Sequence, residues 1–265
     1  MEAVLCSDTA ADFLCDIGTG AATPTQIVKY CRSLAKSPSC ADELRCLSRF
    51  GTVHYNNVER DMHKFFSDTY AVEPYPLDLD VYDDEGNEIR MRVPALAVHE
   101  MFAAMLANGS DVLAGPACSP LQYWDEAAKS TWGREHPANC EYAAHKEHMV
   151  PINLHSDGVE TYRDTEYHCF SWSSALSFGG RGDTFDRIVL ILLLVESCMI
   201  SGVTFDQVIA FITWSFAAMS AGIHPFRDHL GRPLTGKRAA KAGTPLFGSW
   251  RGIFSSWLGD SKASW

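Results

Sequence analysis

The clearest hydrophobic pattern lies in the last third of the chain. From residue 149 to 155, Val150, Ile152 and Leu154 fall on one face of an extended chain, and polar residues fall on the other. This alternation predicts a strand whose polar face ends in Asp157, with a turn at Gly158. A second strand is predicted over residues 167–174. A third, apolar on both faces like a strand in a covered sheet, is predicted over residues 187–196.

A long amphipathic helix is predicted after these three strands. Thr204 and Gln207 have the spacing of a capping box, and apolar residues then recur at every third or fourth position as far as Met219. Gly222 is a suitable C-terminal stop. A last strand is predicted over residues 250–258, followed by Gly259 and Asp260. The order is therefore strand, strand, strand, helix, strand.

The first half of the chain shows a different pattern. Helices are predicted over residues 25–34, 41–50 and 57–66, and a hairpin over 77–82 and 89–93 with its turn at 85–87. A packed helix over 95–106 follows, and residues 111–149 have the composition of loops. We therefore expect a helical N-terminal region (1–72), a connector with a hairpin, a helix and loops (73–148), and a C-terminal domain (149–265).

The order of the C-terminal elements is that of an α/β fold of the ribonuclease-H-like type, with a mixed sheet. In that topology the right-handed crossover places the fourth strand parallel to the first and beside it. Asp157 and Asp260 would then face each other on neighbouring strands. Two adjacent carboxylates suit a divalent cation, Mg²⁺ or Mn²⁺, and a pair of such ions supports phosphoryl transfer. Taken singly, each aspartate next to a glycine is more typical of a turn than of a metal site.

Several short segments resemble a known family. Multiplied open reading frames of protist genomes contain segments that are similar, in content and order, to five parts of this sequence. These parts are residues 150–158 (VPINLHSDG), 171–174 (SWSS), 57–61, 94–100 and 250–260. Those frames resemble degenerate cut-and-paste transposases of the Plavaka or KDZ type. The resemblance spans residues 50–265 and implies the ribonuclease-H-like fold, with Asp157 and Asp260 as metal ligands and catalytic residues.

The pattern departs from such a transposase at one point. The family needs a third acidic residue on a helix after a fifth strand, and this sequence stops at Trp265. We therefore expect a truncated or domesticated derivative that has lost catalytic activity, with its fourth strand as an exposed sheet edge. The alternative is a non-catalytic module that holds a protein partner through its N-terminal half and its acidic hairpin.

The charge of the chain is unevenly distributed. Its formal net charge is −11, which argues against a protein that binds nucleic acid with its whole surface. One segment, however, carries six basic residues against the single acid Asp228. These are Arg227, Arg232, Lys237, Arg238, Lys241 and Arg251. Placed beside a metal site, this segment would contact the phosphates of DNA; the common alternative is a solvated surface.

The cysteine and histidine pattern allows one further site. Nine cysteines include no C-x-x-C pair, which is typical of neither a disulfide scaffold nor a common zinc motif. A zinc-stabilised domain is the third hypothesis, and its candidate ligands are Cys118, His136, Cys140, His145 and His148. With no signal peptide and no apolar run long enough for a bilayer, we expect an intracellular protein, nuclear or cytoplasmic, and no membrane partner.

Overall fold

A computed structural model gives the fold of the chain. It describes residues 22–37, 42–51, 58, 60–61, 72–107, 113, 118–160, 166–177 and 187–259. The chain divides into two compact units, Met1–Ala71 and Val72–Trp265. The second unit is a mixed α/β structure with a two-stranded antiparallel sheet and a four-stranded mixed sheet.

The first unit contains two described helices. Helix α2 (Pro24–Leu34) begins at Thr23, whose hydroxyl accepts a hydrogen bond from the amide of Gln26, while the side chain of Gln26 reaches back to the Thr23 amide. Helix α3 (Asp42–Leu47) packs against α2. The helix predicted over 57–66 lies largely outside the described residues. Buried apolar side chains join the described parts: Ile27, Val28, Cys31, Leu44, Leu47 and Val58.

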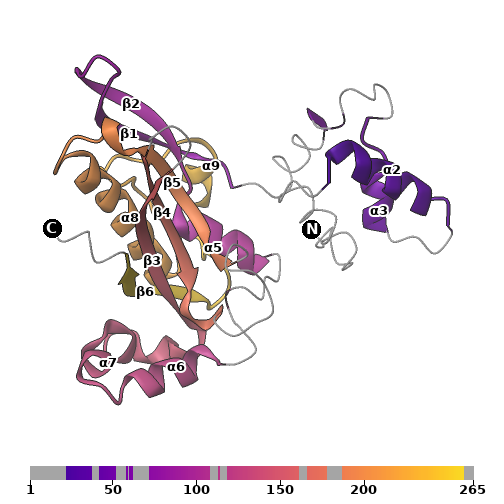
Figure 1. Ribbon diagram of the computed structural model, residues 1–265. Helices are drawn as coiled ribbons and strands as arrows, with labels where there is room; N and C mark the ends of the chain where they lie inside the picture. The colour runs from indigo at the N-terminus through magenta and orange to yellow at the C-terminus, as the bar shows by residue number, and fades with distance from the viewer. Residues whose placement is uncertain are drawn as a thin grey trace. The chain divides into compact units, whose positions relative to one another are not determined.

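The four-stranded sheet is the centre of the second unit (Figure 1). Its strands are β3 (Met149–Glu160), β4 (Glu166–Ser174), β5 (Val189–Val195) and β6 (Arg251–Leu258). The spatial order is β5-β4-β3-β6, in which β3, β4 and β5 form an antiparallel meander and β6 lies parallel to β3. The predicted strands and their parallel neighbour are therefore present. Short 3₁₀ turns follow β4 (Ala175–Ser177) and β5 (Glu196–Cys198).

Helix α8 (Thr204–Ala221) connects β5 to β6 and covers one face of this sheet (Figure 1). Val150, Ile152 and Leu154 of β3 pack in the same core as the buried side of α8. The helix ends at Gly222, whose φ of +72° is a conformation that residues with a side chain rarely adopt. The predicted capping box is wrong, because the N-cap position is Val203, and Thr204 and Gln207 instead bind Asp80 of the hairpin.

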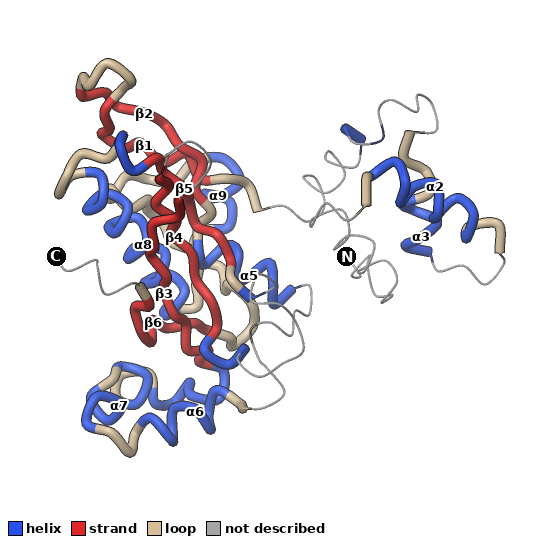
Figure 2. The backbone as a smooth tube through the Cα atoms, viewed as in Figure 1, coloured by secondary structure: helices blue, strands red, loops and turns tan. Residues whose placement is uncertain are grey.

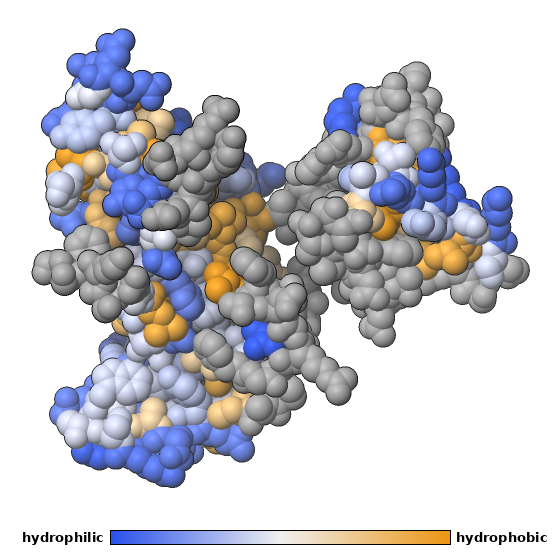
Figure 3. Space-filling view, in the orientation of Figure 1, coloured by the Kyte–Doolittle hydropathy of each residue, from blue (hydrophilic) through white to orange (hydrophobic). Residues whose placement is uncertain are grey.

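The hairpin consists of β1 (Tyr75–Tyr82) and β2 (Glu88–Ala95), and helix α5 (Val98–Ala107) follows it. Gly86 in the turn has a φ of +81°. Alternate residues of β1 are buried in the core that β1, β2 and α5 share with the main sheet and α8. On the outer face Asp78 and Asp80 pair with Arg92 and Arg90 across the strands, so the hairpin surface is hydrophilic (Figure 3).

The part of residues 111–149 that the structure describes is largely helical, so the predicted loop is wrong there. Helices α6 (Pro120–Ala127) and α7 (Thr131–Glu135) are followed by 3₁₀ helices η2 (Pro137–Asn139) and η3 (Ala143–His148) (Figure 2). Proline is tolerated at the start of a helix, and Ser119 caps α6 reciprocally with Gln122. Trp124 of α6 packs with Met149 and Ile253 on the side of the sheet away from α8.

No helix among the described residues is long and apolar enough to cross a membrane.

Candidate functional site

Asp157 lies inside β3 and is solvent exposed. Its partner across the ladder is Cys169 of β4. The predicted turn at Gly158 is wrong, because β3 continues through this residue to Glu160. The glycine instead provides space for a neighbouring carboxylate: a Cβ placed on Gly158 would lie 2.5 Å from Oε1 of Glu166.

Asp260, the second predicted ligand, lies outside the described residues, but the chain before it is described. Strand β6 runs beside β3 in parallel, and the last pair in their register is His155 with Leu258. Gly259 still lies against β3, since a Cβ on this residue would approach the carbonyl oxygen of Ser156 to 2.9 Å. The chain therefore stays beside β3 up to the residue that precedes Asp260.

Polar side chains surround Asp157 on the sheet face opposite α8. We call this set the polar stripe: Asn153, His155, Asp157, Cys169, Ser171, Ser173 and Ser256. Two hydrogen bonds connect the three strands that carry it. Nε2 of His155 lies 2.8 Å from Oγ of Ser173, and the hydroxyl of Ser256 donates to Oδ1 of Asn153 at 2.7 Å. Asn153, Ser171 and Ser173 are buried, so the stripe becomes more exposed towards Asp157.

Asp157 is the one carboxylate of the polar stripe. Burial lowers the pKa of His155, which favours the neutral imidazole. Burial also raises the pKa of the Cys169 thiol, and the charge of Asp157 adds to this effect, so the thiol stays protonated. Among the described residues no three His, Cys, Asp or Glu side chains lie in position to share a metal ion. Any cation here would have Asp157 as its one described carboxylate ligand.

The five candidate ligands of the zinc hypothesis all lie among the described residues. They do not form a group that could hold a metal ion. Nε2 of His136 contacts the carbonyl oxygen of Phe254 at 2.9 Å, and its ring stacks on Trp124 at 4.6 Å. The thiol of Cys140 donates to the carbonyl oxygen of Arg134. These side chains hold α6, α7 and η2 together and against β6, which is a structural role.

The basic residues lie on and beside the segment that connects α8 to β6, residues 223–249, which we call the excursion. All four of their guanidinium groups have hydrogen-bond partners within the fold. Arg238 forms a two-pronged ion pair with Glu100 at 2.7 and 2.9 Å, and Arg232 pairs with Asp228 at 2.7 Å. Arg251 donates to the carbonyl oxygens of Ser220 and Ala221 at the end of α8. These residues were predicted to bind nucleic acid, and that role stays a prediction.

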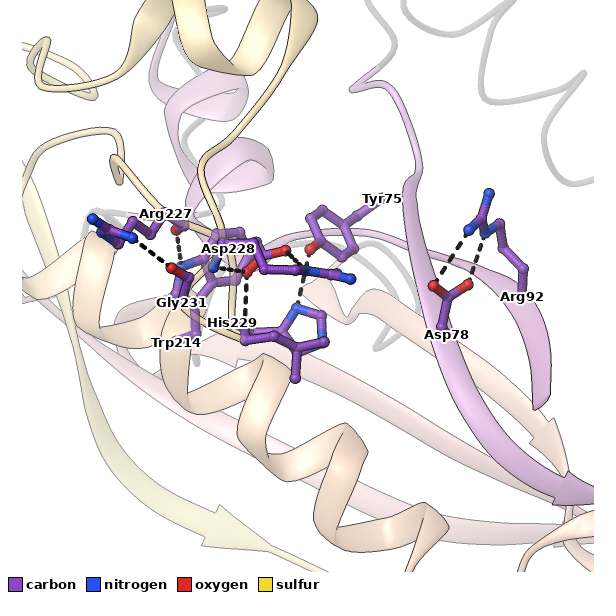
Figure 4. A network of polar contacts seen from close by, with 10 residues as sticks. Tyr75, Asp78, Arg92, Trp214, Arg227, Asp228, His229 and Gly231 are labelled. Carbon is purple, nitrogen blue, oxygen red and sulfur yellow. Dashed lines mark hydrogen bonds and ion pairs between the residues drawn. The ribbon is translucent and has the colours of Figure 1, made fainter.

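Arg227, Lys237 and Lys241 are exposed, as is Arg232. Arg227 donates to the carbonyl oxygen of Gly231 at 2.8 Å (Figure 4). Lys237 and Lys241 lie on the short helix α9 (Gly236–Lys241) and form no ion pair with any residue that the structure describes. These cations extend from the excursion into solvent.

The excursion joins the sheet at the end away from Asp157. Arg251 pairs with Met149, and Asp157 follows Met149 by eight residues along β3, a separation of about 25 Å at 3.3 Å per residue. The basic segment was expected to lie beside the metal site. The structure instead places its junction with the sheet at the opposite end of the strand pair.

Sequence analysis did not find a second polar cluster, in which the excursion packs against β1 and α8 (Figure 4). The hydroxyl of Tyr75 lies 3.0 Å from Nδ1 of His229, and burial raises the pKa of this tyrosine to about 12. The indole of Trp214 donates to the carbonyl oxygen of Arg227. Arg238 lies over the ring of Tyr75, 5.2 Å from its centre. In the sequence these residues are widely separated, and no local motif joins Tyr75, Trp214 and His229.

Comparisons with protein-family models, with curated proteins and with solved structures find no match to this chain. The resemblance to transposases therefore stays a prediction from short sequence motifs.

Proposed function

We propose that this chain derives from a ribonuclease-H-like transposase and keeps the remnant of its metal site. In this proposal Asp157 and Asp260 bind one divalent cation, Mg²⁺ or Mn²⁺, and the chain no longer cleaves DNA. Its remaining function is to bind nucleic acid. The observation that carries the proposal is the parallel pairing of β3 with β6 in a register that leads towards both aspartates.

The strand order supports this derivation. Three antiparallel strands followed by a helix and a fourth strand parallel to the first is the order expected of a ribonuclease-H-like sheet. In an open sheet of this kind the ends of neighbouring parallel strands are common positions for ligand-binding side chains. Fold alone does not determine function, so the proposal depends on the two carboxylates.

The register supports the pairing of those carboxylates. His155 is opposite Leu258, and counting two residues further along each chain reaches Asp157 and Asp260. The close approach of Gly259 to the carbonyl of Ser156 indicates that the two chains have not separated before this point. Side chains at opposed positions of neighbouring strands are about 5 Å apart, which suits two oxygen ligands of one cation.

The donor set fits a hard cation in part. Carboxylate oxygens are ligands that Mg²⁺ and Mn²⁺ prefer, and the exposure of Asp157 leaves room for the water molecules that Mg²⁺ retains. A two-metal nuclease needs more protein ligands than this, and the described residues provide no group of three. Weak cation binding without strand cleavage is the expected outcome.

Two assays test this proposal. Mn²⁺ binding is followed by the loss of the free-ion electron paramagnetic resonance signal, and nicking of supercoiled plasmid is measured in the same buffer. Asp157→Asn should abolish the Mn²⁺ site, whereas Asp84→Asn, which removes an exposed carboxylate in the hairpin turn, should leave it intact. Plasmid nicking that requires Asp157 would contradict the loss of catalysis. Equal Mn²⁺ binding by wild type and Asp157→Asn would overturn the proposed site.

A further inference from the structure

We infer that the excursion carries a stacking surface for single-stranded nucleic acid, centred on Phe226 and flanked by exposed cations. The inference rests on the proposed function for its class of ligand, and it adds the place of binding and the form of the strand. The surface is separate from the polar stripe. Its residues are Phe226, Arg227, Leu230, Lys237 and Lys241.

The excursion has a defined backbone although most of its residues are exposed. The amide of His224 donates to the carbonyl of Thr244, and the amide of Gly243 donates to the carbonyl of His224, each at 2.9 Å. A second contact within the segment joins the amide of Asp228 to the carbonyl of Arg232 at 2.8 Å. An ordered, exposed segment between a helix and a strand is a common place for binding residues.

The tip of the Phe226 ring lies against Gly243. A Cβ on Gly243 would lie 2.5 Å from Cζ of this ring, so the ring can lie here only because this residue, whose φ is +76°, has no side chain. No other residue type would accept both this φ and the contact. Phe226 is nevertheless 65% exposed. A flat aromatic group that is held at its tip and largely open to solvent is suited to stacking against a nucleic-acid base.

The charges of the excursion favour an anionic partner. Lys237, Lys241 and Arg227 are exposed. The single acid of the segment, Asp228, accepts hydrogen bonds from two main-chain amides and pairs with Arg232, so its charge is compensated locally. The rest of this acidic chain would repel a polyanion, which concentrates binding on this one surface.

The planar ring distinguishes a single strand from other anionic partners. The bases of a duplex are already stacked on each other, whereas those of a single strand are available for an aromatic side chain. An acidic protein segment would dock on the apolar surface of Phe226 and Leu230 without any need for a flat ring. Exchange of the ring for an aliphatic side chain therefore separates the two partners.

The test measures fluorescence anisotropy of labelled oligo-thymidine and oligo-adenosine with the full chain, in EDTA so that no cation contributes. Phe226→Trp should bind at least as tightly as wild type, and Phe226→Leu should bind about tenfold more weakly. Phe254→Leu, which changes an exposed phenylalanine on β6, is the matched control and should bind like wild type. Circular dichroism melting verifies that each variant is folded.

A second set of variants tests the cations. Changing both Lys237 and Lys241 to glutamine should lower the slope of log affinity against log salt by about 1.4, or 0.7 for each charge removed. Lys129→Gln on α6–α7, whose side chain is also exposed, should leave the slope unchanged. This arm tests the surface even if a Phe226 variant does not fold.

Four results would overturn the inference. They are absence of binding, equal affinity of Phe226→Leu and Phe226→Trp, tighter binding of a duplex than of a single strand, and full displacement by poly-glutamate at matched charge. Asp157→Asn should not affect oligonucleotide binding in EDTA. Loss of the predicted oligonucleotide binding with an intact Mn²⁺ site would therefore show that the stacking surface is wrong. Loss of the Mn²⁺ site with intact oligonucleotide binding would show that the metal site is wrong.

Discussion

Thr204, at the start of α8, donates a hydrogen bond to the carbonyl oxygen of Asp80 in β1 over 2.6 Å. The same hydroxyl accepts a bond from the amide of Ile200 at 2.8 Å, and the residue is fully buried. Gln207, one turn further along, accepts a bond from the amide of Asp80 at 2.8 Å. Two side chains of α8 thus bind the main-chain amide and carbonyl of Asp80, as a neighbouring strand would. These hydrogen bonds attach the hairpin to α8.

Thr204→Val tests this attachment, because valine keeps the shape of threonine and removes both hydrogen bonds. We expect the free energy of unfolding in urea to fall by about 1–3 kcal/mol, since the Asp80 carbonyl and the Ile200 amide lose their partner. Thr131→Val is the matched control. Its hydroxyl accepts from Arg134 at an exposed position, and its loss should cost less than about 0.5 kcal/mol. Similar effects of the two substitutions would show that Thr204 does not anchor the hairpin.

The buried His99 predicts acid sensitivity of the fold. Its ring lies 2.8 Å from Oγ of Ser215 and edge-on to Trp214, and burial lowers its pKa to about 3. In the unfolded chain a histidine takes up its proton near pH 6.5. The unfolded state therefore binds more protons between these two values. The stability that His99 contributes is complete above about pH 6.5 and decreases as the pH falls towards 3.

Urea unfolding at several pH values between 7 and 5 measures this effect. His99→Asn keeps an acceptor for the Ser215 hydroxyl and removes the titrating group, so the pH slope of the free energy of unfolding should flatten by about 1.4 kcal/mol per pH unit below pH 6. His145→Gln, which replaces a histidine outside the core, should leave the wild-type slope. An unchanged slope in His99→Asn would exclude this residue as a source of acid sensitivity.

The ion pair of Arg238 with Glu100 predicts a structural effect at a residue with a predicted role in nucleic-acid binding. Both side chains are mostly buried, with 17% and 15% exposed. Arg238→Gln leaves the Glu100 carboxylate without its partner and should lower the free energy of unfolding by about 3 kcal/mol. Adding Glu100→Gln should restore part of that loss, because both buried charges are then absent. A double variant less stable than the single one would contradict this account.

His136 protects part of the exposed edge that sequence analysis expected at β6. Its ring donates to the carbonyl oxygen of Phe254, and the hydroxyl of Ser220 donates to that of Gly252 at 3.1 Å. His136→Leu should lower the melting temperature and increase light scattering by aggregates in the unheated sample. The substitution leaves the carbonyl of Phe254 free to pair with another chain. His148→Leu, which changes an edge-on contact with Trp250, serves as the control. Equal scattering by the two variants would indicate that His136 does not protect the edge.

The elements of the main sheet were predictable because each has a strong period. Alternation in β3 and the apolar run of β5 identified strands, and the stripe of α8 identified a helix. Turn chemistry at Gly86 placed the hairpin. Local signals were weaker guides. Gly158 suggested a turn, yet β3 continues through this residue, because it pairs with His168 of β4.

The tertiary contacts could not be predicted from single segments. Thr204 and Gln207 have the spacing of a capping box, but the nearby strand β1 offers stronger partners for the same groups. The sequence suggests that the basic segment forms one charged surface. In the fold, however, Arg238 pairs with Glu100, and Arg251 binds the carbonyl of Ser220. Which of the basic side chains have partners depends on contacts between distant parts of the chain, and single segments do not show these contacts.

The pairing of Asp157 with Asp260 is tested most directly by the position of a bound cation. Crystals grown with Mn²⁺, measured at a wavelength where manganese scatters anomalously, give that position without assumptions about the ligands. The account predicts one anomalous peak within about 2.2 Å of an oxygen of each carboxylate. A peak elsewhere, or an ordered Asp260 whose carboxylate points away from Asp157, would contradict it.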